Sequence, residues 1–533
     1  MPSQKVSLFR PCLAVCYLAW HFVLGVSLSF CQDVLTYHDN NSRTGLNSSE
    51  TILTPSNVNF ATFGKLFTAT VDGLVDAQPL YLSKVTVQGS PHNLLIVATE
   101  HDSLYAFDAD DGELLWHIST LKSGETTSDD RGCAQVTPEI GITSTPAIVR
   151  PAGSNGVIYT VAMSKTSSGI YRQRLHALDA ATGKELYNGP VDIAAKFPGV
   201  GDNNSGGYVI FDPGQYEERA GLLFSKGVIY LTWTSHCDIR PYTGWIMGYD
   251  AIKLVQKTVL NLTPNGKEGS IWGAGAGPAA DTSGNMFLLD ANGTFDASLN
   301  AYGFPSSGDY GNAFLKLSTT RGIAVADYFE MSNGQQESEE DKDLGSGGVI
   351  LLPDMQDSSG TVWQLAAGAG KDSNLYLVDR NSMGKFDPSS NNIYQELTGV
   401  LPGGIWSTPA YFNNRLYYGP VGQPILAFQF QNGKLLNAPV ARTTNTFIYP
   451  GASPSISSNP QGSNAVVWAA ENLNHAVLHA YNANTLVELY NSNQAPGGRD
   501  HFGSGNKFIT PMIANGKVYV GTKTGVGVFG LLP

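Results

Sequence analysis

One phrase recurs along this chain and limits what the chain can fold into. It first reads Leu-Tyr-Ala-Phe-Asp-Ala-Asp-Asp-Gly-Glu-Leu-Leu-Trp over residues 104–116, and it returns as Leu-His-Ala-Leu-Asp-Ala-Ala-Thr-Gly-Lys-Glu-Leu over residues 175–186. Shorter echoes begin at Met247, Leu375, Leu426 and Leu478. An alternating apolar strand, an Asp-x-x-x-Gly turn and a second apolar strand are typical of a β-hairpin. Because a single hairpin is marginally stable in water, a recurring one predicts modules that stack on their copies.

Eight such units can be marked off, each with room for a four-stranded sheet in roughly 40 to 65 residues. They begin near Gly or Pro, at Gln78, Thr145, Gly221, Gly277, Gly348, Thr408, Ser453 and Thr510. The last unit ends one strand short, whereas an apolar strand over residues 63–71 precedes the first unit. We therefore predict an all-β, eight-bladed β-propeller whose ring is closed by this N-terminal strand, which completes the last blade. A seven-bladed ring is the alternative.

The composition agrees with many short strands joined by tight turns. The chain has 59 Gly, 24 Tyr and 23 Phe, and only 14% of its residues are charged. The formal net charge of −13 disfavours a nucleic-acid partner, and the sequence has no basic run. Residues 331–343 are rich in Glu, Gln and Ser, which predicts an acidic surface loop.

The N-terminus has the pattern of a secretory signal. Lys5 and Arg10 precede an apolar stretch over residues 13–30, and polar sequence follows. We predict a signal peptide over residues 1–31, a single propeller domain over residues 32–533, and a secreted or periplasmic location. An uncleaved N-terminal anchor is the alternative, and no later segment is expected to cross a membrane.

Two cysteines remain after this leader, Cys133 and Cys237. In an exported protein they could form one disulfide, but their spacing does not decide the matter. The chain has no Cys-x-x-Cys-His motif, so no covalently attached haem is expected.

In a propeller, the loops after the second strand of each blade share one face with the loops that lead into the next blade. Here these loops are rich in charged and aromatic residues, a ring that suits a polar, flat or charged ligand. The loops after the second strands carry Glu100, His101, Lys165, His236, Asp238, Asp290, Asn292, Lys371, Asp372, Glu471 and Lys523. The connecting loops add Glu139, Arg219, Trp272, Asp343, Trp406, Arg499 and His501.

The repeated phrase, in an exported chain, resembles the pyrroloquinoline-quinone (PQQ) repeat of quinoprotein alcohol dehydrogenases. The resemblance covers nearly all of the chain after the leader. It implies an eight-bladed propeller with PQQ and a calcium ion in a central funnel. Non-enzymatic scaffold propellers of bacterial outer-membrane assembly carry the same repeat, so the repeat specifies the fold more than the activity.

The resemblance also implies roles for individual residues. Trp272 stands where the family stacks a Trp beneath the quinone. Asn292, Asp309 and Asp238 are the implied calcium ligands, Asp309 being also the general base, and Asp238 stands where the family has a longer Glu. Lys371 matches the family's basic residue near the quinone oxygens, in the closest match of all. The remaining expected cofactor contacts are Glu100, His101 and Trp406; the family's adjacent Cys pair is absent from the loop that holds Glu100.

Three hypotheses follow. The first is a PQQ- and calcium-dependent dehydrogenase of a small polar alcohol, sugar or polyol, which passes electrons to a separate acceptor. The second is a non-catalytic binding or scaffold propeller whose charged mouth holds a peptide or glycan. The third is a metal-dependent hydrolase or lyase that uses His101, His236 and His501.

Overall fold

The computed structural model describes Met1 and residues 32–533 of the chain. The predicted signal peptide therefore lies, apart from Met1, outside the described residues. Within the part that is described, no helix has the length and apolar character needed to cross a membrane.

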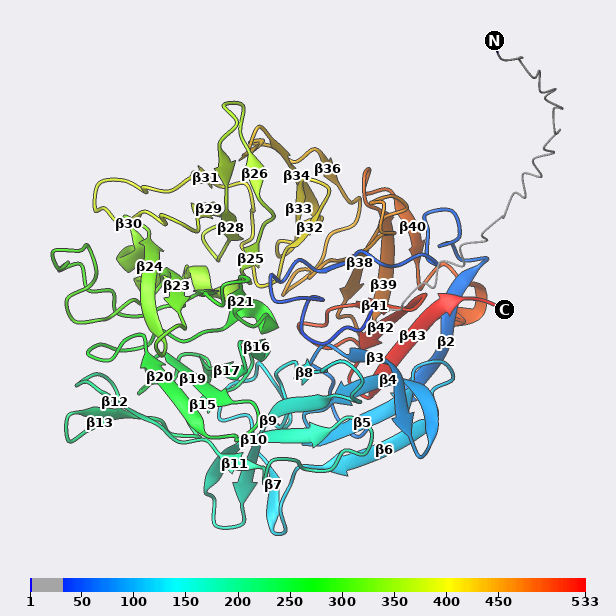
Figure 1. Ribbon diagram of the computed structural model, residues 1–533, viewed down its shortest axis with the longest axis horizontal. Helices are drawn as coiled ribbons and strands as arrows, with labels where there is room; N and C mark the ends of the chain where they lie inside the picture. The colour runs from blue at the N-terminus through cyan, green and yellow to red at the C-terminus, as the bar shows by residue number, and fades with distance from the viewer. Residues whose placement is uncertain (2–31) are drawn as a thin grey trace. The chain divides into compact units, whose positions relative to one another are not determined.

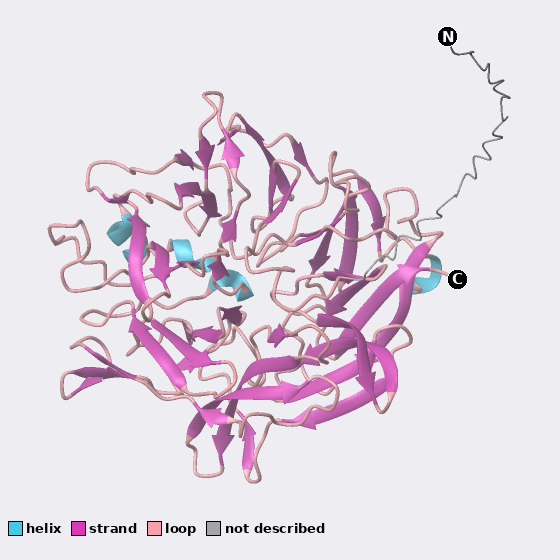
Figure 2. Cartoon of the chain, in the orientation of Figure 1, coloured by secondary structure: helices cyan, strands magenta, loops and turns pink. Residues whose placement is uncertain are grey.

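The described part consists almost wholly of β-strands, and eight of its sheets have four or five strands (Figures 1 and 2). The first sheet contains β3 (Leu80–Val87), β4 (Ser90–Ala98), β5 (Ser103–Asp108) and β6 (Leu114–Ser119), and the second contains β7 (Glu125–Thr127), β8 (Ala147–Val149), β9 (Val157–Thr166), β10 (Tyr171–Asp179) and β11 (Val191–Asp192). The third sheet contains β16 (Leu223–Ser225), β17 (Val228–Thr232), β19 (Trp245–Asp250) and β20 (Gln256–Asn261). The fourth contains β21 (Ala279–Ala280), β22 (Met286–Leu289), β23 (Phe314–Ser318), β24 (Ala324–Glu330) and β30 (Lys385–Phe386).

The fifth sheet contains β25 (Ile350–Leu351), β28 (Leu365–Gly368), β29 (Leu375–Asp379) and β31 (Gln395–Leu397), and the sixth contains β32 (Ala410–Phe412), β33 (Arg415–Tyr418), β34 (Leu426–Gln431), β35 (Lys434–Leu435) and β36 (Ala441–Arg442). The seventh sheet contains β1 (Leu46–Asn47), β37 (Ser455–Ser457), β38 (Val466–Glu471), β39 (Val477–Asn482) and β40 (Glu488–Asn491). The eighth contains β2 (Phe63–Thr70), β41 (Met512–Ala514), β42 (Lys517–Gly521) and β43 (Gly525–Leu531). Smaller sheets join β12 (Lys196–Pro198), β13 (Asn204–Ser205) and β14 (Tyr208–Ile210); β15 (Tyr216–Glu217) and β18 (Thr234–Ser235); and β26 (Met355–Gln356) and β27 (Val362–Trp363). Helical turns in the described part are η1 (Gly273–Gly275), α1 (Gly334–Glu339), η2 (Leu344–Ser346) and η3 (Pro496–Gly498).

The repeated phrase forms a hairpin turn in both of its full copies. In the first copy, the Gly112 N–H donates to the Asp108 carbonyl at 2.9 Å, and the Asp108 side chain accepts from the N–H of Asp110 at 2.8 Å. In the second copy, Gly183 and Asp179 make the same backbone bond at 2.8 Å. Asp bends the chain by bonding to the backbone two residues on, and Gly supplies the positive φ that closes the turn.

The same turn receives an aromatic side chain from the neighbouring sheet. Trp116 on β6 donates from Nε1 to the Ala180 carbonyl at 3.0 Å, and its ring lies against Gly183. Phe67 on β2 lies against Gly112 in the same way. The outermost strand of one sheet therefore packs on the turn of the next sheet, and β2 takes this role for the sheet of β41–β43.

Replacing Gly183 with Ala is expected to lower the free energy of unfolding by about 2 kcal/mol. Gly183 has a φ of 67°, and a Cβ there would lie 2.8 Å from the Trp116 ring. Gly169→Ala is the matched control, because Gly169 has a φ of 82° with no neighbouring atom in reach; its cost is expected to be about 1 kcal/mol. Equal midpoints of chemical denaturation for the two variants would show that the contact with Trp116 has no energetic weight.

The N-terminal strand pairs with the end of the chain. Antiparallel pairing of β2 with β43 runs from Phe63 opposite Leu531 to Thr70 opposite Gly525. The Tyr519 hydroxyl on β42 also donates to the carbonyl of Ala109 in the first sheet at 3.5 Å. The same contact joins Tyr159 to Ala251 at 2.5 Å and Tyr417 to Ala483 at 2.8 Å. One kind of packing contact therefore links neighbouring sheets in three places.

A segment that the sequence analysis did not interpret, residues 34–47, contacts each of the eight sheets in turn. In Figure 1 it belongs to the blue trace that crosses the middle of the described part. Its hydrogen-bond partners lie on β3, β8, β16, β21, β25, β32, β37 and β41, in that order. They are Tyr81, Ile148, Phe224, Ala280, Leu351, Tyr411, Ile456 and Ile513. We call residues 34–47 the axial arm.

Two buried side chains of the axial arm fill the space between the sheets. Arg43 is fully buried and donates to Thr36 Oγ1 at 2.7 Å, to the Tyr37 carbonyl at 3.0 Å and to the carbonyls of Leu222 and Pro278. Tyr37 donates from its hydroxyl to Thr408 Oγ1 at 3.0 Å. Burial lowers the pKa of Arg43 to about 10. The arm is thus a core element rather than a loose leader.

The stretch 331–343 lies largely at the surface, as its composition predicts, and Glu339, Glu340 and Asp341 are exposed. It contains α1, and Glu337 is 7% exposed and Asp343 1% exposed. Two acidic side chains of this stretch are therefore buried, which its composition does not predict. Asp343 instead has a basic partner 28 residues further on.

His479 on β39 is a buried histidine held between two glutamates. Its Nδ1 lies 2.7 Å from Glu488 Oε1, and its Nε2 lies 3.1 Å from Glu471 Oε1. Burial disfavours the charged imidazole, but the hydrogen bonds and charges of the two glutamates outweigh burial and raise its pKa above the ordinary value of 6.5. Folding therefore favours the protonated imidazole.

The variant His479→Gln is expected to lose about 2 kcal/mol of stability near pH 6, and less as the pH rises. The folded pKa is raised, so the contribution of His479 is fully present below 6.5 and disappears as pH rises through the folded value. Urea denaturation at about pH 6 and about pH 9 measures this difference. His475→Gln, at an exposed histidine, is the control and is expected to change stability by less than about 0.5 kcal/mol at both values. A penalty for His479→Gln that does not depend on pH would contradict the assignment.

Candidate functional site

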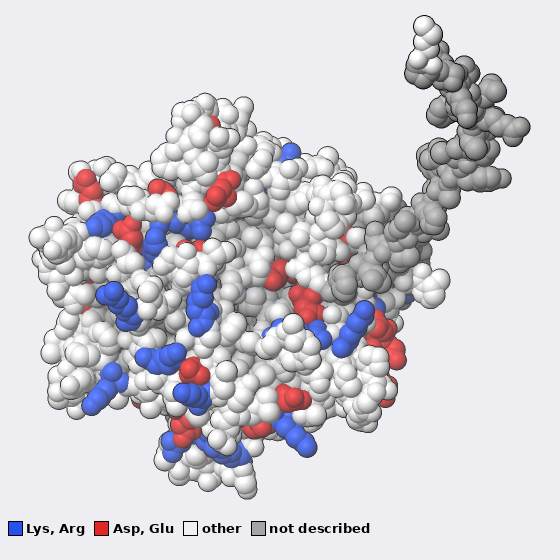
Figure 3. Space-filling view, in the orientation of Figure 1, with Lys and Arg blue, Asp and Glu red and all other residues white. Residues whose placement is uncertain are grey.

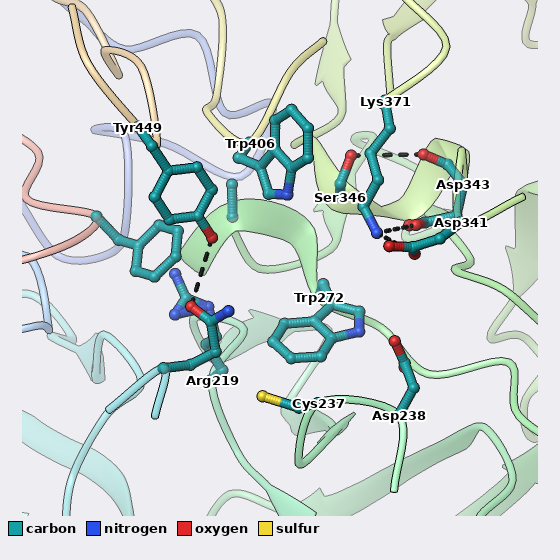
Figure 4. Close-up of a pocket in the computed structure, with 13 residues that line it drawn as sticks. Arg219, Cys237, Asp238, Trp272, Asp341, Asp343, Ser346, Lys371, Trp406 and Tyr449 are labelled. Carbon is teal, nitrogen blue, oxygen red and sulfur yellow. Dashed lines mark hydrogen bonds and ion pairs between the residues drawn. The ribbon is translucent and has the colours of Figure 1, made fainter. Parts of the chain in front are cut away.

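A cavity of about 430 Å³ lies where loops from seven of the eight sheets meet (Figure 4). Its lining side chains come from the connections between sheets and from the turns after second strands. Each sheet from the second to the eighth contributes at least one lining residue from its loops. These residues include Gln135, Arg219, Asp238, Trp272, Asp343, Lys371, Trp406, Tyr449 and Phe508. Residues up to 373 positions apart in the sequence therefore line one space, a placement that only the stacked sheets provide.

At one end of the cavity, Lys371 lies between two carboxylates (Figure 4). Its Nζ is 2.7 Å from Asp343 Oδ1 and also pairs with Asp341. Burial raises the pKa of Asp343, and the nearby ammonium opposes this shift. Burial disfavours the charge of Lys371, but the two carboxylates outweigh burial and raise its pKa above the usual value. This end therefore holds a fixed ammonium group at neutral pH.

Aromatic rings form the walls. Trp406 and Tyr449 meet edge to face with centroids 5.9 Å apart, and Tyr449 contacts Phe508 in the same way at 6.5 Å. Trp272 lies on another side of the cavity (Figure 4). The residues after Trp272, Gly273 and Ala274, have φ values of 55° and 54°, which turn the chain sharply at the indole. The walls suit a flat ligand.

A disulfide borders the cavity beside Trp272 and Asp238. Cys237 is bonded to Cys133, and the two Cα atoms are 5.4 Å apart. The bond joins the loop before β8, which carries Gln135, to the loop after β18, which carries Asp238. Asp238 Oδ1 accepts from the Tyr242 hydroxyl at 2.7 Å and from Ser235 Oγ at 3.0 Å, so the carboxylate is fixed in position.

Arg219 lies at the end of the cavity away from Lys371 (Figure 4). Its guanidinium carbon is 3.4 Å from the centroid of the Phe508 ring. Arg219 and Phe508 also line a second, inner cavity of about 10 Å³ together with Asp76. This pair of side chains thus separates the main cavity from a space that holds about one water molecule.

Asp76, which lines the inner cavity, interacts electrostatically with two further buried acids, Glu217 and Glu100. Burial raises the pKa of Asp76, and the charge of Arg219 opposes this. Burial raises the pKa of Glu217 to about 7, and burial together with the charge of Asp76 raises that of Glu100 well above its usual range. Glu100 Oε2 accepts from the Gly141 N–H and from Thr143 Oγ1, both at 2.9 Å. These groups lie behind Arg219 and form no part of the main cavity wall.

The structure brings together six of the residues singled out from the sequence, since the cavity is lined by Arg219, Asp238, Trp272, Asp343, Lys371 and Trp406. Glu100 is fully buried behind it. His101 is half exposed and pairs instead with Glu139, its Nδ1 3.0 Å from Oε1.

The three predicted calcium ligands have different surroundings. Asp238 lines the cavity, and the Asn292 amide donates to Asp341 Oδ1 at 2.7 Å. Asp309 does not line it, and its carboxylate accepts from the Asn265 N–H and from Ser307 Oγ, both at 2.9 Å. Among the described residues, no group of three or more His, Cys, Asp or Glu side chains has the arrangement to hold a metal ion. Two of the three cavity carboxylates, Asp341 and Asp343, pair with Lys371.

The three histidines of the hydrolase hypothesis are also apart. His236 is buried, and burial lowers its pKa to about 4. Within the part of the chain that the structure describes, neither of its ring nitrogens has a hydrogen-bond partner. His501 is exposed and stacks on His475 with centroids 5.6 Å apart. In the described structure, His101 pairs with Glu139 and not with His236 or His501. The geometry therefore gives this hypothesis no support.

Six lining residues were not anticipated: Gln135, Ala274, Asp341, Ser346, Tyr449 and Phe508. A signal for Phe508 is present in the sequence. Trp406 and Phe508 each stand two residues before a Thr-Pro pair that begins a unit, so an aromatic residue at that position faces the cavity. Outside the cavity, the face drawn in Figure 3 has acidic and basic side chains interspersed.

Comparison with known proteins identifies the fold. The sequence model of the outer membrane protein assembly factor BamB family matches residues 75–200. A comparison with curated protein sequences found no match. Among solved structures, a quinohemoprotein alcohol dehydrogenase from Comamonas testosteroni is similar with a TM-score of 0.62 at 14% identity, over 94% of this chain and 80% of that one.

Two further structures agree. The quinohemoprotein alcohol dehydrogenase ADHIIG from Pseudomonas putida HK5 gives a TM-score of 0.63 at 12% identity, over 94% of this chain and 80% of that one. A europium-containing methanol dehydrogenase gives 0.60 at 12% identity, over 94% and 98%. At these identities the likeness concerns the fold. The resemblance inferred from the repeated phrase is thereby confirmed: the chain has the all-β fold of the PQQ-repeat β-propeller family, to which these dehydrogenases belong.

Proposed function

We propose that this protein is an exported, PQQ-dependent oxidoreductase that oxidises a small polar alcohol, sugar or polyol in the cavity and passes electrons to a separate acceptor. The carrying observation is the convergence of Trp272, Trp406, Lys371 and Asp238 on one cavity, in a fold shared with quinoprotein alcohol dehydrogenases. We further propose that residues 32–533 form one eight-bladed ring closed by β2. The eight sheets, the pairing of β2 with β43 and the order of contacts along the axial arm support this.

The cavity residues fit PQQ. Indole rings offer flat apolar contacts to a planar cofactor, and the cations of Lys371 and Arg219 at opposite ends match a molecule that carries quinone oxygens and carboxylates. When bound, PQQ would supply the quinone that accepts a hydride from the alcohol carbon. The predicted calcium ligands do not form a donor set, so no step below uses a metal ion.

Each cavity residue has a definable task. The Lys371 ammonium, held by Asp343 and Asp341, would stabilise negative charge on an oxygen placed at its end of the cavity. Asp238 Oδ2 would accept the proton of the substrate hydroxyl, because Oδ1 is already occupied by Tyr242 and Ser235. Trp272 and Trp406 would exclude water from the space between them. Asp309, which the resemblance implies as the base, lies outside this space and receives no task here.

The test is reconstitution of the purified full-length chain with PQQ, with and without Ca²⁺, followed by dye reduction over a panel of alcohols and sugars. Asp238→Asn is expected to lower kcat/KM by about 10²-fold, the range for loss of a general base. Asp309→Asn is the matched control and is expected to keep nearly full activity. No turnover on any substrate would reject the redox proposal in favour of a binding or scaffold propeller. Loss of activity in Asp309→Asn but not in Asp238→Asn would return the base to Asp309.

A further inference from the structure

Arg219 has a buried charge with no hydrogen-bond acceptor among the residues that the structure describes. The side chain is 3% exposed, yet among the described residues none accepts a hydrogen bond from it or forms an ion pair with it. A guanidinium has five N–H donors in a planar fork, and a buried polar group normally has its donors satisfied. The missing acceptor must therefore come from a water molecule or from a ligand.

The position of Arg219 favours a ligand. One face of the guanidinium is covered by Phe508 at 3.4 Å, and Phe508 is in turn packed against Tyr449. Stacking fixes the plane of the fork, so that its N–H edges have a defined direction and little rotamer entropy is lost on binding. Because Arg219 lines the main cavity, an acceptor group there can meet this edge.

The other charges show that the site suits an anion. Lys371, the cation at the opposite end, is already neutralised by Asp341 and Asp343. The acids nearest Arg219 are Asp76 and Glu217, which interact with it only at longer range. Lys507 lies at the same end, its Nζ 3.2 Å from Gln135 Oε1. Burial, and to a smaller extent the charge of Arg219, lower the pKa of Lys507. This end of the cavity therefore has an excess of hydrogen-bond donors and positive charge.

We infer that Arg219 is the anion-recognition residue of the cavity, and that the molecule bound there carries a carboxylate that accepts two parallel hydrogen bonds from the guanidinium. The carboxylate belongs either to the cofactor or to the substrate. The inference rests on the proposed function only in taking this cavity as the ligand site; it does not require redox chemistry.

The first test uses a ligand that cannot undergo the reaction. Quinoline-2-carboxylate and quinoline-2-carboxamide differ in charge but little in shape, and their binding to the full-length chain is followed by calorimetry and by tryptophan fluorescence. The wild type is expected to bind the acid about 10- to 100-fold more tightly than the amide, as charge-assisted hydrogen bonds imply. Arg219→Gln is expected to abolish this preference and Arg219→Lys to keep only part of it.

Arg131→Gln is the matched control. Arg131 is also stacked on an aromatic ring, 4.2 Å from the centroid of Tyr171, but its guanidinium already donates to Gly214 and Tyr171. Its replacement is expected to leave the preference unchanged. Since Arg219→Gln could impair folding, labelling of wild-type arginines with phenylglyoxal gives an independent measurement. The acid, and not the amide, is expected to slow modification of Arg219 as detected by mass spectrometry.

Repeating the titration with PQQ identifies the source of the carboxylate. If Arg219→Gln weakens PQQ binding, the carboxylate is that of the cofactor. If PQQ binds Arg219→Gln normally, but substrates with a carboxylate no longer have a lower KM than substrates without one, the carboxylate is that of the substrate. No binding of the acid to the wild type, an equal affinity for the amide, or a preference retained in Arg219→Gln would each overturn the inference. Failure of PQQ to bind or turn over, with the acid preference intact, would instead reject only the redox proposal.

Discussion

Replacing Lys371 with Met is expected to lower kcat/KM for dye reduction by about 10²- to 10³-fold, the usual loss when a preorganised group that stabilises developing negative charge is removed. The methionine fills a similar volume but offers neither a charge nor an N–H at that end of the cavity. It also leaves Asp343, whose side chain is 2% exposed, without its ammonium partner. Because burial already raises the pKa of Asp343, this carboxyl is expected to bind a proton in the variant.

The loss of the counter-ion would also affect stability, so the two effects must be separated. The double variant Lys371→Met with Asp343→Asn removes the uncompensated carboxylate and is expected to recover stability but not activity. Lys342→Met is the matched control, because Lys342 pairs with Glu340 on the exposed side of the same segment. Recovery of activity in the double variant would show that Lys371 acts through the fold alone.

Replacing Arg43 with Met is expected to lower the free energy of unfolding by about 3 kcal/mol. Four oxygen acceptors, contributed by Thr36, Tyr37, Leu222 and Pro278, would lose their donor in a place without bulk water. Each unsatisfied acceptor costs about 1 kcal/mol, and release of the buried charge offsets part of the sum. Denaturation by guanidinium chloride measures the change.

Arg415→Met is the control for Arg43. Arg415 also donates to a backbone carbonyl, that of Asn484, and to a side-chain amide oxygen, that of Gln429. Unlike Arg43, however, it is partly exposed. Water can replace the arginine there, so the expected loss is less than about 1 kcal/mol. Equal losses for the two variants would contradict a central role of the axial arm in stability.

The repeated phrase predicted the fold well because its information is local. Each full copy of the phrase contains its own Asp and Gly turn. The sequence predicts eight unit starts, from Gln78 to Thr510, and a strand begins two residues after each of them. The surplus strand over residues 63–71 was also matched correctly to the short last unit. Alternation and turn chemistry are legible in one sequence, since both depend on neighbouring residues.

The site was harder to predict because it depends on positions across the sheets. Trp272 and Lys371 were placed by their loops, and the geometry brings them together. Asp309 was assigned by its order along the chain, but a short loop holds it against Asn265 instead. The pairing of Cys133 with Cys237, 104 residues apart, could not be deduced from spacing. No local pattern marks the axial arm, because it forms almost no regular structure of its own.

The order of contacts along residues 34–47 has a consequence for how this protein can change over time. Because successive residues of this stretch are matched to successive sheets, gaining or losing one amino acid would displace every later match by a step. Sequence length should therefore be strictly constrained here, even where residue identity is not. The tip around Gly153, where an added Cβ would meet no neighbouring atom, should by contrast accept extra residues freely.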